Sequence, residues 1–340
     1  MLNLRNCFTA LCLVASIAPV HARDYHYSDA HLHFVDFFQE SDGMSKLLRA
    51  MDAGDIDHVI ISGIPVAKKW HENEPKRPRY YAGDDAPVYW YSATDVVVAA
   101  ALKELDEEQR RRFHPFLSGF NPNDKNADAH IRRMLDLDPG LWQGLGEIFT
   151  RHDDVTALTE GDTPRANNEA LARVYHLAAE FDLPVMLHSN ITSKRERNPL
   201  YLAELEEPLR NHPHTRFIWA HAGTSMELHR HQEKLDFLLP TVTRLLDDYP
   251  NLFIDLSWTV LEPYLLDADG NPDAQWVKLV KRHPTRFVLG SDVVGRFDNL
   301  SEAMNAFTPF LDALPSDVAQ QVARDNFLAL LPRNRQAESR

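Results

Sequence analysis

The sequence predicts one α/β domain with the (β/α)8 architecture of a TIM barrel. Three observations support this fold class: short runs rich in β-branched residues alternate with amphipathic segments, the alternation repeats eight times, and the chain has 340 residues. Strands that alternate with helices pair as parallel β-α units. Eight such units indicate a closed barrel rather than an open sheet, and barrels of this size form a single domain.

The strands and helices are predicted from the period of the apolar residues. The eight predicted strands are residues 27–34, 58–63, 113–121, 144–149, 184–189, 216–223, 252–258 and 286–293. The predicted helices are residues 41–53, 94–111, 128–137, 167–180, 199–210, 233–249, 272–282, 301–313 and 316–330. Thr94 and Ser301 are predicted N-caps, because a hydroxyl side chain can accept a bond from a free N–H group at a helix start.

Two of the predicted βα loops are longer than the usual two to six residues. Residues 65–93 follow the second strand, and residues 150–166 follow the fourth. Loops on this side of a barrel surround its C-terminal mouth, so we expect them to form lids or pocket walls. The first loop holds six Trp and Tyr residues, a composition that is unusual for a disordered segment.

Composition and charge limit the classes of partner. The formal net charge is −14, and 44% of the residues are hydrophobic, enough for a large core. Nothing suggests a nucleic-acid partner, because that would call for a basic patch or stripe. We expect a small molecule as the partner, while self-association into a homo-oligomer stays open.

The N-terminal segment is predicted to be a secretory signal peptide over residues 1–22, followed by a single domain over residues 23–340. Arg5 provides a positive start, the following apolar run is too short for a membrane span, and Ala22 ends a small-residue cleavage site. We therefore expect an exported protein, periplasmic or secreted, with no membrane span after signal removal. Cys7 and Cys12 both lie in the signal, so the mature chain has no cysteine. The alternative is a buried N-terminal helix of an unprocessed protein.

A pair of histidines near the start of the domain is the first sign of a metal site. His31 and His33 stand two residues apart in the first predicted strand, in the run SDAHLHF. Side chains at i and i+2 of a strand point to the same face. The pair would therefore aim two imidazoles at one point, and neutral imidazole is the commonest metal ligand.

Four more residues of ligand type lie late in other predicted strands. They are Glu147 in the fourth strand, His188 in the fifth, His221 in the sixth and Asp292 in the eighth. In a barrel the strand ends converge on one mouth. Buried polar groups are costly without partners, and a divalent ion bound by these groups would supply them.

The motifs, taken in order, resemble the amidohydrolase superfamily. Its amidohydrolase-related group, which includes lactone hydrolases and non-oxidative decarboxylases, is the most similar branch. The resemblance extends over residues 28–330 and agrees with the barrel predicted above. The runs that carry it are DAHLHF, GLGEI, MLHS, WAHAG and VLGSD.

The resemblance implies roles for the residues at the strand ends. His31, His33, Asp292 and His188 would be ligands of a divalent metal, and His221 would bind a second metal or touch the substrate. Many two-metal members carry a carbamylated lysine on the fourth strand, where this sequence has a glutamate.

That glutamate, Glu147, leaves two interpretations open. Some members use a glutamate there as a bridging ligand, which would allow two metals. It could also be a hydrogen-bonded carboxylate outside the ligand set. One or two ions are therefore possible. Zn²⁺ suits the His and carboxylate set best, while Mn²⁺ or Fe²⁺ stay open because selectivity depends on geometry and supply.

The resemblance favours hydrolysis of an amide, lactone or ester bond of a small molecule. Asp292 would accept a proton from a metal-activated water and pass it to the leaving group, and His221 would polarise the carbonyl or hold the second metal. One alternative is non-oxidative decarboxylation of an aromatic or related acid, with Asp292 as the proton donor. Another is a barrel that binds a ligand without catalysis.

Substrate contacts are predicted from polar and aromatic residues near the strand tops. The cationic ones could bind an anionic group, although each also fits ordinary surface charge. The candidates are Trp70, Tyr91, Asn190, Lys194, Arg195, Trp258 and Arg296.

Overall fold

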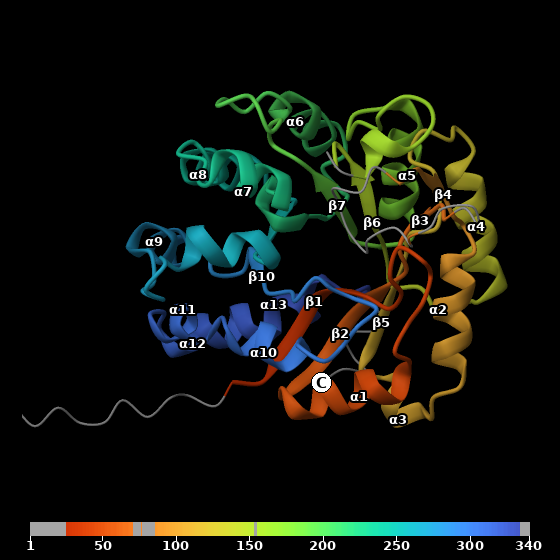
Figure 1. Ribbon diagram of the computed structural model, residues 1–340, viewed down its shortest axis with the longest axis horizontal. Coiled ribbons are helices and arrows are strands. Elements are labelled where there is room, and N and C mark those ends of the chain that lie inside the picture. Colours follow the sequence, from red (N-terminus) through yellow and green to blue (C-terminus); the bar gives the residue numbers. More distant parts are fainter. Residues whose placement is uncertain (1–24, 71–75, 77–85, 153–154, 334–340) are drawn as a thin grey trace, which may run out of the picture.

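Parallel strands arranged as a TIM barrel confirm the predicted fold class (Figure 1). The structure is a computed structural model that describes residues 25–70, 76, 86–152 and 155–333. The predicted signal peptide lies outside these residues. The sheet order is β10-β9-β8-β7-β6-β5-β2-β1-β11. Its strands are β1 (Tyr27–His33), β2 (Ile56–Ser62), β5 (Phe113–Leu117), β6 (Gly144–Thr150), β7 (Val185–Ser189), β8 (Phe217–Trp219), β9 (Leu252–Asp255), β10 (Phe287–Val288) and β11 (Val293–Val294).

The first and last strands of the barrel meet. The N–H of Ala30 in β1 donates to the carbonyl of Leu289, which directly follows β10, at 2.8 Å. Further along, Leu32 and His33 of β1 pair with β11. The predicted eighth strand is therefore two short strands, and the region of β1 that carries the histidine pair contacts β11 and Leu289, the residue after β10.

Helices cover the outer side of the barrel (Figure 1). The α-helices are α1 (Met44–Ala53), α2 (Thr94–Lys103), α3 (Glu107–Arg110), α4 (Ala127–Leu137), α5 (Glu169–Glu180), α6 (Leu202–Asn211), α7 (Met226–Gln232), α8 (Leu238–Asp248), α9 (Ala274–Arg282), α10 (Leu300–Asn305), α11 (Thr308–Asp312), α12 (Ser316–Gln320) and α13 (Asn326–Leu330). The short helical segments are η1 (Thr156–Leu158), η2 (Ala220–Gly223), η3 (Trp258–Val260), η4 (Leu261–Leu265) and η5 (Gln321–Asp325). Among the described residues, none of these helices has the length and apolar character needed to cross a membrane.

Two apolar clusters form the core. The larger cluster lies between the sheet and the outer helices, and the smaller one fills the barrel interior. Phe327 and Leu330 of α13 belong to the smaller cluster, and α13 contacts β1 and β10. The other buried members of the interior are Ala30, Ile60, Phe116, Met186, Ile218, Ala220, Val288 and Leu331. The interior is therefore packed with side chains beneath the carboxyl ends of the strands, as in other barrels of this type.

The two long loops contain secondary structure of their own. In the first, β3 (Val66–Lys68) and β4 (Val88–Trp90) pair as an antiparallel hairpin. Residues 71–75 and 77–85 of that loop lie outside the described residues. The second loop contains η1. Both loops follow strands at the barrel mouth, as the sequence predicts.

Some predicted boundaries were wrong, for local reasons. The predicted helix over residues 94–111 is divided into α2 and α3, because Asp106 and Gln109 form a capping box that starts a new helix. Thr94 and Ser301 are not N-caps, since both lie inside helices. The Thr94 hydroxyl instead accepts a bond from the N–H of Ile64, at 3.1 Å.

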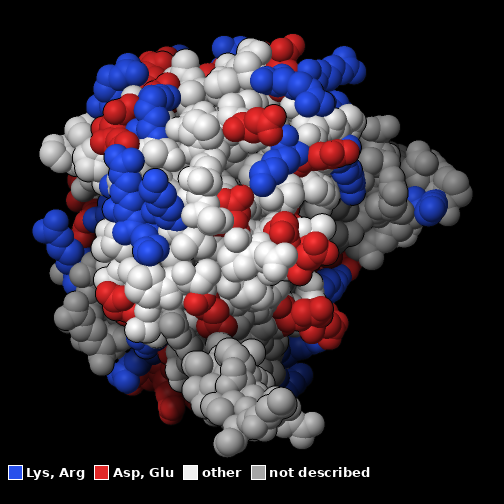
Figure 2. Space-filling view, turned by 90° about the vertical axis from the view of Figure 1, so that its left-hand side faces the viewer, with Lys and Arg blue, Asp and Glu red and all other residues white. Residues whose placement is uncertain are grey.

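Charged side chains of both signs are interspersed on the face that Figure 2 shows. The described residues include exposed or half-buried ion pairs, such as Arg244 with Glu206 at 2.7 Å and Arg282 with Asp247 at 2.7 Å. Exposed pairs of this kind contribute little to stability. We therefore attribute the stability of the domain to its apolar clusters and its buried hydrogen bonds.

Replacing Asp95 by Ala is expected to lower the free energy of unfolding by about 1–3 kcal/mol. Asp95 in α2 is fully buried, and its carboxylate accepts bonds from the N–H groups of Ser118 at 3.0 Å and Gly119 at 2.8 Å. The substitution would leave both buried donors without this acceptor. Urea unfolding measures the change, with the exposed Glu104→Ala as the control. An effect no larger than that of the control would contradict a stabilising role of Asp95 as the acceptor for these two N–H groups.

Candidate metal centre

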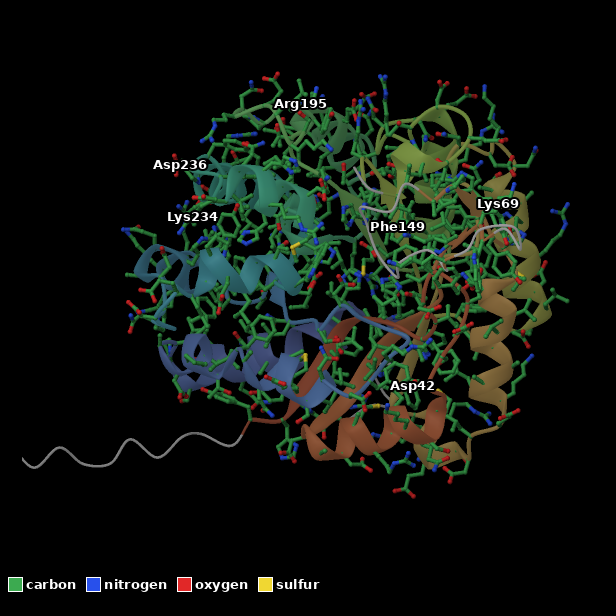
Figure 3. The ribbon with its side chains drawn as sticks, viewed as in Figure 1. Asp42, Lys69, Phe149, Arg195, Lys234 and Asp236 are labelled. Atoms are coloured by element: carbon green, nitrogen blue, oxygen red, sulfur yellow. The ribbon has the colours of Figure 1, made fainter. Side chains whose placement is uncertain are left out.

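The six predicted ligand-type residues come together at the carboxyl ends of the strands. Five of them are buried, and the sixth, Asp292, has a side chain that is 12% exposed. Figure 3 shows Phe149, two residues after Glu147 on β6, in the middle of the molecule where the strand ends meet. The six residues are His31 and His33 on β1, Glu147 on β6, His188 on β7, His221 in η2 and Asp292 between β10 and β11.

Glu147 lies at the centre of this cluster, and its two carboxylate oxygens face different histidine pairs. Oε2 is 3.2 Å from Nε2 of His31 and 3.1 Å from Nε2 of His33. Oε1 is 2.9 Å from Nδ1 of His188 and 3.6 Å from Nε2 of His221. One side chain therefore connects two pairs of imidazoles.

Asp292 also reaches both pairs. Its Oδ1 is 3.5 Å from Nε2 of His31 and 3.6 Å from Nε2 of His33, and its Oδ2 is 3.8 Å from Nε2 of His221. Glu147 thus belongs to two groups of possible metal ligands. Within each group, the ligand atoms all lie within 4.8 Å of one another. Group 1 is His31, His33, Glu147 and Asp292, and group 2 is Glu147, His188 and His221.

The second ring nitrogen of every histidine in the cluster has an oxygen partner. A ring N–H that donates to such a partner leaves the other nitrogen with its lone pair directed at the cluster. The partners are Asp255 Oδ2 for His31 Nδ1 at 2.8 Å, the Gly63 carbonyl for His33 Nδ1 at 3.0 Å, Asn190 Oδ1 for His188 Nε2 at 3.0 Å and Ser257 Oγ for His221 Nδ1 at 2.8 Å. This donor set, four imidazoles and two carboxylates, fits divalent metal ions such as Zn²⁺.

Burial and neighbouring charges shift the pKa values of His31 and Glu147 in opposite directions. Burial lowers the pKa of His31, but the negative charges of Glu147 and Asp292 outweigh it, and the pKa is well above its ordinary value of 6.5. Burial raises the pKa of Glu147, but His31 and hydrogen bonds from the other imidazoles hold it well below 4.5. Glu147 is therefore ionised, as a metal ligand must be.

Unusual backbone conformations direct several of these side chains. His221, Trp258 and Asp292 all have positive φ angles, of 52°, 51° and 52°. Such conformations are costly for residues other than glycine and occur often at functional sites. For Asp292, the N–H donates to the His31 carbonyl at 2.7 Å, which fixes the loop against β1. Positive φ at His221 also ends β8 earlier than the predicted strand.

A glycine makes room for the central carboxylate. Gly146 precedes Glu147 and has a φ of 123°. A Cβ atom there would lie 2.3 Å from the carbonyl oxygen of Met186 on β7. Only glycine fits this close approach without a shift of the backbone.

Two of the predicted substrate contacts lie at the cluster. Asn190 is buried and bonds to His188, as described above. The ring of Trp258 contacts that of His221, with 5.1 Å between the ring centroids. Trp258 is only partly buried, so it lies at the rim of the site.

The other predicted contacts have different surroundings. Trp70 is half exposed, Tyr91 packs against Tyr89, and Arg195 lies at the edge of the molecule in Figure 3. The cationic groups of Lys194 and Arg296 face carboxylates. These are Glu227 at 3.7 Å from Lys194, and Asp36, Glu40 and Asp42 at 2.9, 3.1 and 3.4 Å from Arg296.

Two residues next to the cluster, Asp255 and His152, were not predicted from the sequence. Asp255 ends β9, and the rule that selected His188 and His221 at strand ends would have found it. His152 is buried and stacks on His188, with 4.2 Å between ring centroids. It lies in a loop, where no periodic pattern predicts the direction of a side chain.

Comparison with known proteins adds a family match and a set of similar folds. The family model described as Amidohydrolase matches residues 28–333. No match was found among the curated proteins.

Three solved structures illustrate the similar folds. An amidohydrolase from Burkholderia multivorans with bound zinc has 13% identity and a TM-score of 0.55, with 89% of this chain and 98% of that chain covered. A probable 2-pyrone-4,6-dicarboxylic acid hydrolase from Acinetobacter baumannii has 12% identity and a TM-score of 0.54, with coverage of 90% and 98%. A dihydroorotase from Campylobacter jejuni has 16% identity and a TM-score of 0.53, with coverage of 90% and 82%. At these identities the likeness concerns the fold.

Proposed function

Because this chain belongs to the amidohydrolase family, we propose that it is a metal-dependent hydrolase that cleaves an amide, lactone or ester bond of a small molecule. The observation that carries the proposal is the position of Glu147 between two pairs of imidazoles, with one carboxylate oxygen toward each pair. A carboxylate with two oxygens is suited to bridging two cations. We therefore favour two divalent ions over one.

The proposed ligands follow the two groups of side chains. His31, His33 and Asp292 would hold one ion, His188 and His221 the other, and Glu147 both. Zn²⁺ is the ion that we favour, since nitrogen and carboxylate ligands suit it. When bound, such an ion would lower the pKa of a bound water, so that hydroxide forms near neutral pH, and would polarise a carbonyl oxygen.

The chain itself supplies proton transfer and shielding from water. Asp292 is the most exposed of the six ligand-type residues, so its carboxylate can accept a proton from the attacking water and return it to the leaving group. Phe149 packs near His33 and His188, and Trp258 packs on His221. These aromatic rings exclude bulk water and strengthen the electrostatic interactions inside the site.

The first test is the metal content of the purified protein beside that of a His31→Asn/His33→Asn variant. We expect about two divalent ions per chain in the wild type and loss of at least one in the variant. A panel of p-nitrophenyl esters, lactones and N-acyl amides then tests hydrolysis, while CO₂ release from aromatic acids tests decarboxylation. A wild-type protein that stays metal-free after incubation with Zn²⁺ and Mn²⁺ would contradict the proposal.

Removal of metal by a chelator is expected to lower the Tm of the wild type by roughly 5–10 °C. A ligand present at 1,000 times its Kd stabilises the folded state by about 4 kcal/mol, and this converts to a shift of that size for a large domain. Differential scanning fluorimetry measures the change. The His31→Asn/His33→Asn variant is the control and should show a smaller shift. Equal Tm values for the wild type with and without chelator would count against a bound metal.

A further inference from the structure

A buried carboxylate outside the six proposed ligands touches both groups at once. Asp255 ends β9, and none of its surface is exposed. Its Oδ2 lies 2.8 Å from Nδ1 of His31, 2.5 Å from Oγ of Ser257 and 3.3 Å from the backbone nitrogen of His221. Its Oδ1 accepts from the N–H of Ser257 at 3.0 Å. A buried carboxylate is tolerated only with such a set of donors.

The direction of these hydrogen bonds follows from the chemistry of the groups. An ionised carboxylate can only accept hydrogen bonds, so the hydroxyl of Ser257 donates a hydrogen bond to Asp255. The Ser257 oxygen then accepts from the Nδ1–H of His221, at 2.8 Å. His31 likewise donates its Nδ1–H directly to Asp255. Both Nε2 atoms face Glu147, at 3.2 and 3.6 Å. In the neutral form that a metal requires, the single ring proton of each imidazole lies on Nδ1, so the Nε2 lone pair is free to bind the ion.

The two imidazoles belong to different groups of ligands. His31 is in group 1 and His221 is in group 2, and their rings stack with 4.8 Å between centroids and 14° between planes. We propose that Asp255 is a positioning residue that sets the tautomer and orientation of one ligand in each group, directly for His31 and through Ser257 for His221. This inference rests on the proposed metal centre. Asp255 forms a third possible group of ligand atoms with His31 and His221, but its Oδ2 faces Nδ1 of both rings, at 2.8 and 3.7 Å. The Nε2 atoms of the same rings face Glu147, so the inference assigns to Asp255 the role of a hydrogen-bond acceptor and not of a metal ligand.

Asp255→Asn and Ser257→Ala separate the direct contact from the relayed one. The asparagine amide has nearly the shape of the carboxylate but also donates, which permits the wrong tautomer of His31. Partners of this kind affect metal affinity by 10- to 100-fold. We expect Asp255→Asn to weaken binding of both ions by about 10–100-fold, and Ser257→Ala to weaken binding of one ion while the other stays within about twofold.

Zn²⁺ titration in competition with a chromogenic chelator measures both affinities. Asp269→Asn, at an exposed carboxylate, is the matched control and should leave them unchanged. In the Co²⁺-loaded proteins, NMR should show a shifted, exchangeable Nδ1–H resonance for each bonded imidazole. The His31 resonance should be lost in Asp255→Asn and the His221 resonance in Ser257→Ala. A purely structural role of Asp255 would not remove individual resonances.

The outcomes distinguish this inference from the proposed function. If the wild type binds Zn²⁺ and both variants bind it with unchanged affinity, the positioning role is wrong while the metal centre stands. If Asp255→Asn lowers the metal stoichiometry with no change in affinity for the remaining ion, Asp255 is itself a ligand and the inference is overturned. If the wild type binds no metal, the proposed function fails first and the inference falls with it. If Asp255→Asn does not fold, the Ser257→Ala arm decides alone, since it deletes only one hydroxyl.

Discussion

The Asp292→Asn variant is expected to keep its fold and to lose about 10²–10⁴-fold in kcat/KM, the range for removal of a general acid–base group. Asparagine cannot accept a proton from water or pass one to a leaving group. The fold should survive because asparagine tolerates the positive φ of 52° found at this position. The measurement is kcat/KM with any member of the panel that the wild type turns over.

Two controls make this result specific to Asp292. Asp269→Asn changes the charge by the same amount at an exposed site and should leave kcat/KM unchanged. Metal analysis of Asp292→Asn separates loss of proton transfer from loss of the ion. Turnover within a few fold of wild type, at full metal content, would rule out Asp292 as the proton-transfer group.

The Glu147→Gln variant is expected to change the metal content most strongly, from about two ions per chain to one or none. Glutamine offers one oxygen, and its NH₂ group cannot act as a ligand. The two oxygens of Glu147 face the His31–His33 pair and the His188–His221 pair separately, so one group of ligands must lose its shared carboxylate. Inductively coupled plasma mass spectrometry of dialysed protein measures the stoichiometry.

Glu104→Gln, at an exposed glutamate of the same charge, is the control for this substitution. Two retained ions in Glu147→Gln would show that Glu147 is a hydrogen-bonded carboxylate outside the ligand set. Retention of one ion with residual hydrolysis would show that group 1 or group 2 alone suffices for the reaction. Both results would leave the barrel and its histidine cluster in place.

The alternation of strands and helices was sufficient to predict the barrel because each β-α unit is specified locally. The same alternation predicted that the six ligand-type residues would lie close together, since they occur late in parallel strands and such strands end at one mouth of the barrel. His31 and His33 illustrate this: their spacing on a strand predicts a common direction, and both Nε2 atoms face the same oxygen of Glu147.

Features that depend on contacts between distant segments could not be predicted in this way. Arg296 was an anion-binding candidate, but three carboxylates from the loop after β1 surround it. Thr94 has the right side chain for a cap, yet its hydroxyl bonds to Ile64. The division of the eighth strand depends on the positive φ of Asp292, which the sequence does not reveal at a residue other than glycine.

The side chains that fill the barrel interior, with Phe327 of α13 among them, have a consequence for the route by which a substrate of the proposed hydrolase would reach the cluster. A molecule cannot pass through a barrel whose axis is occupied, so a substrate would have to approach the cluster from the carboxyl ends of the strands. Products would have to leave by the opening through which the substrate came.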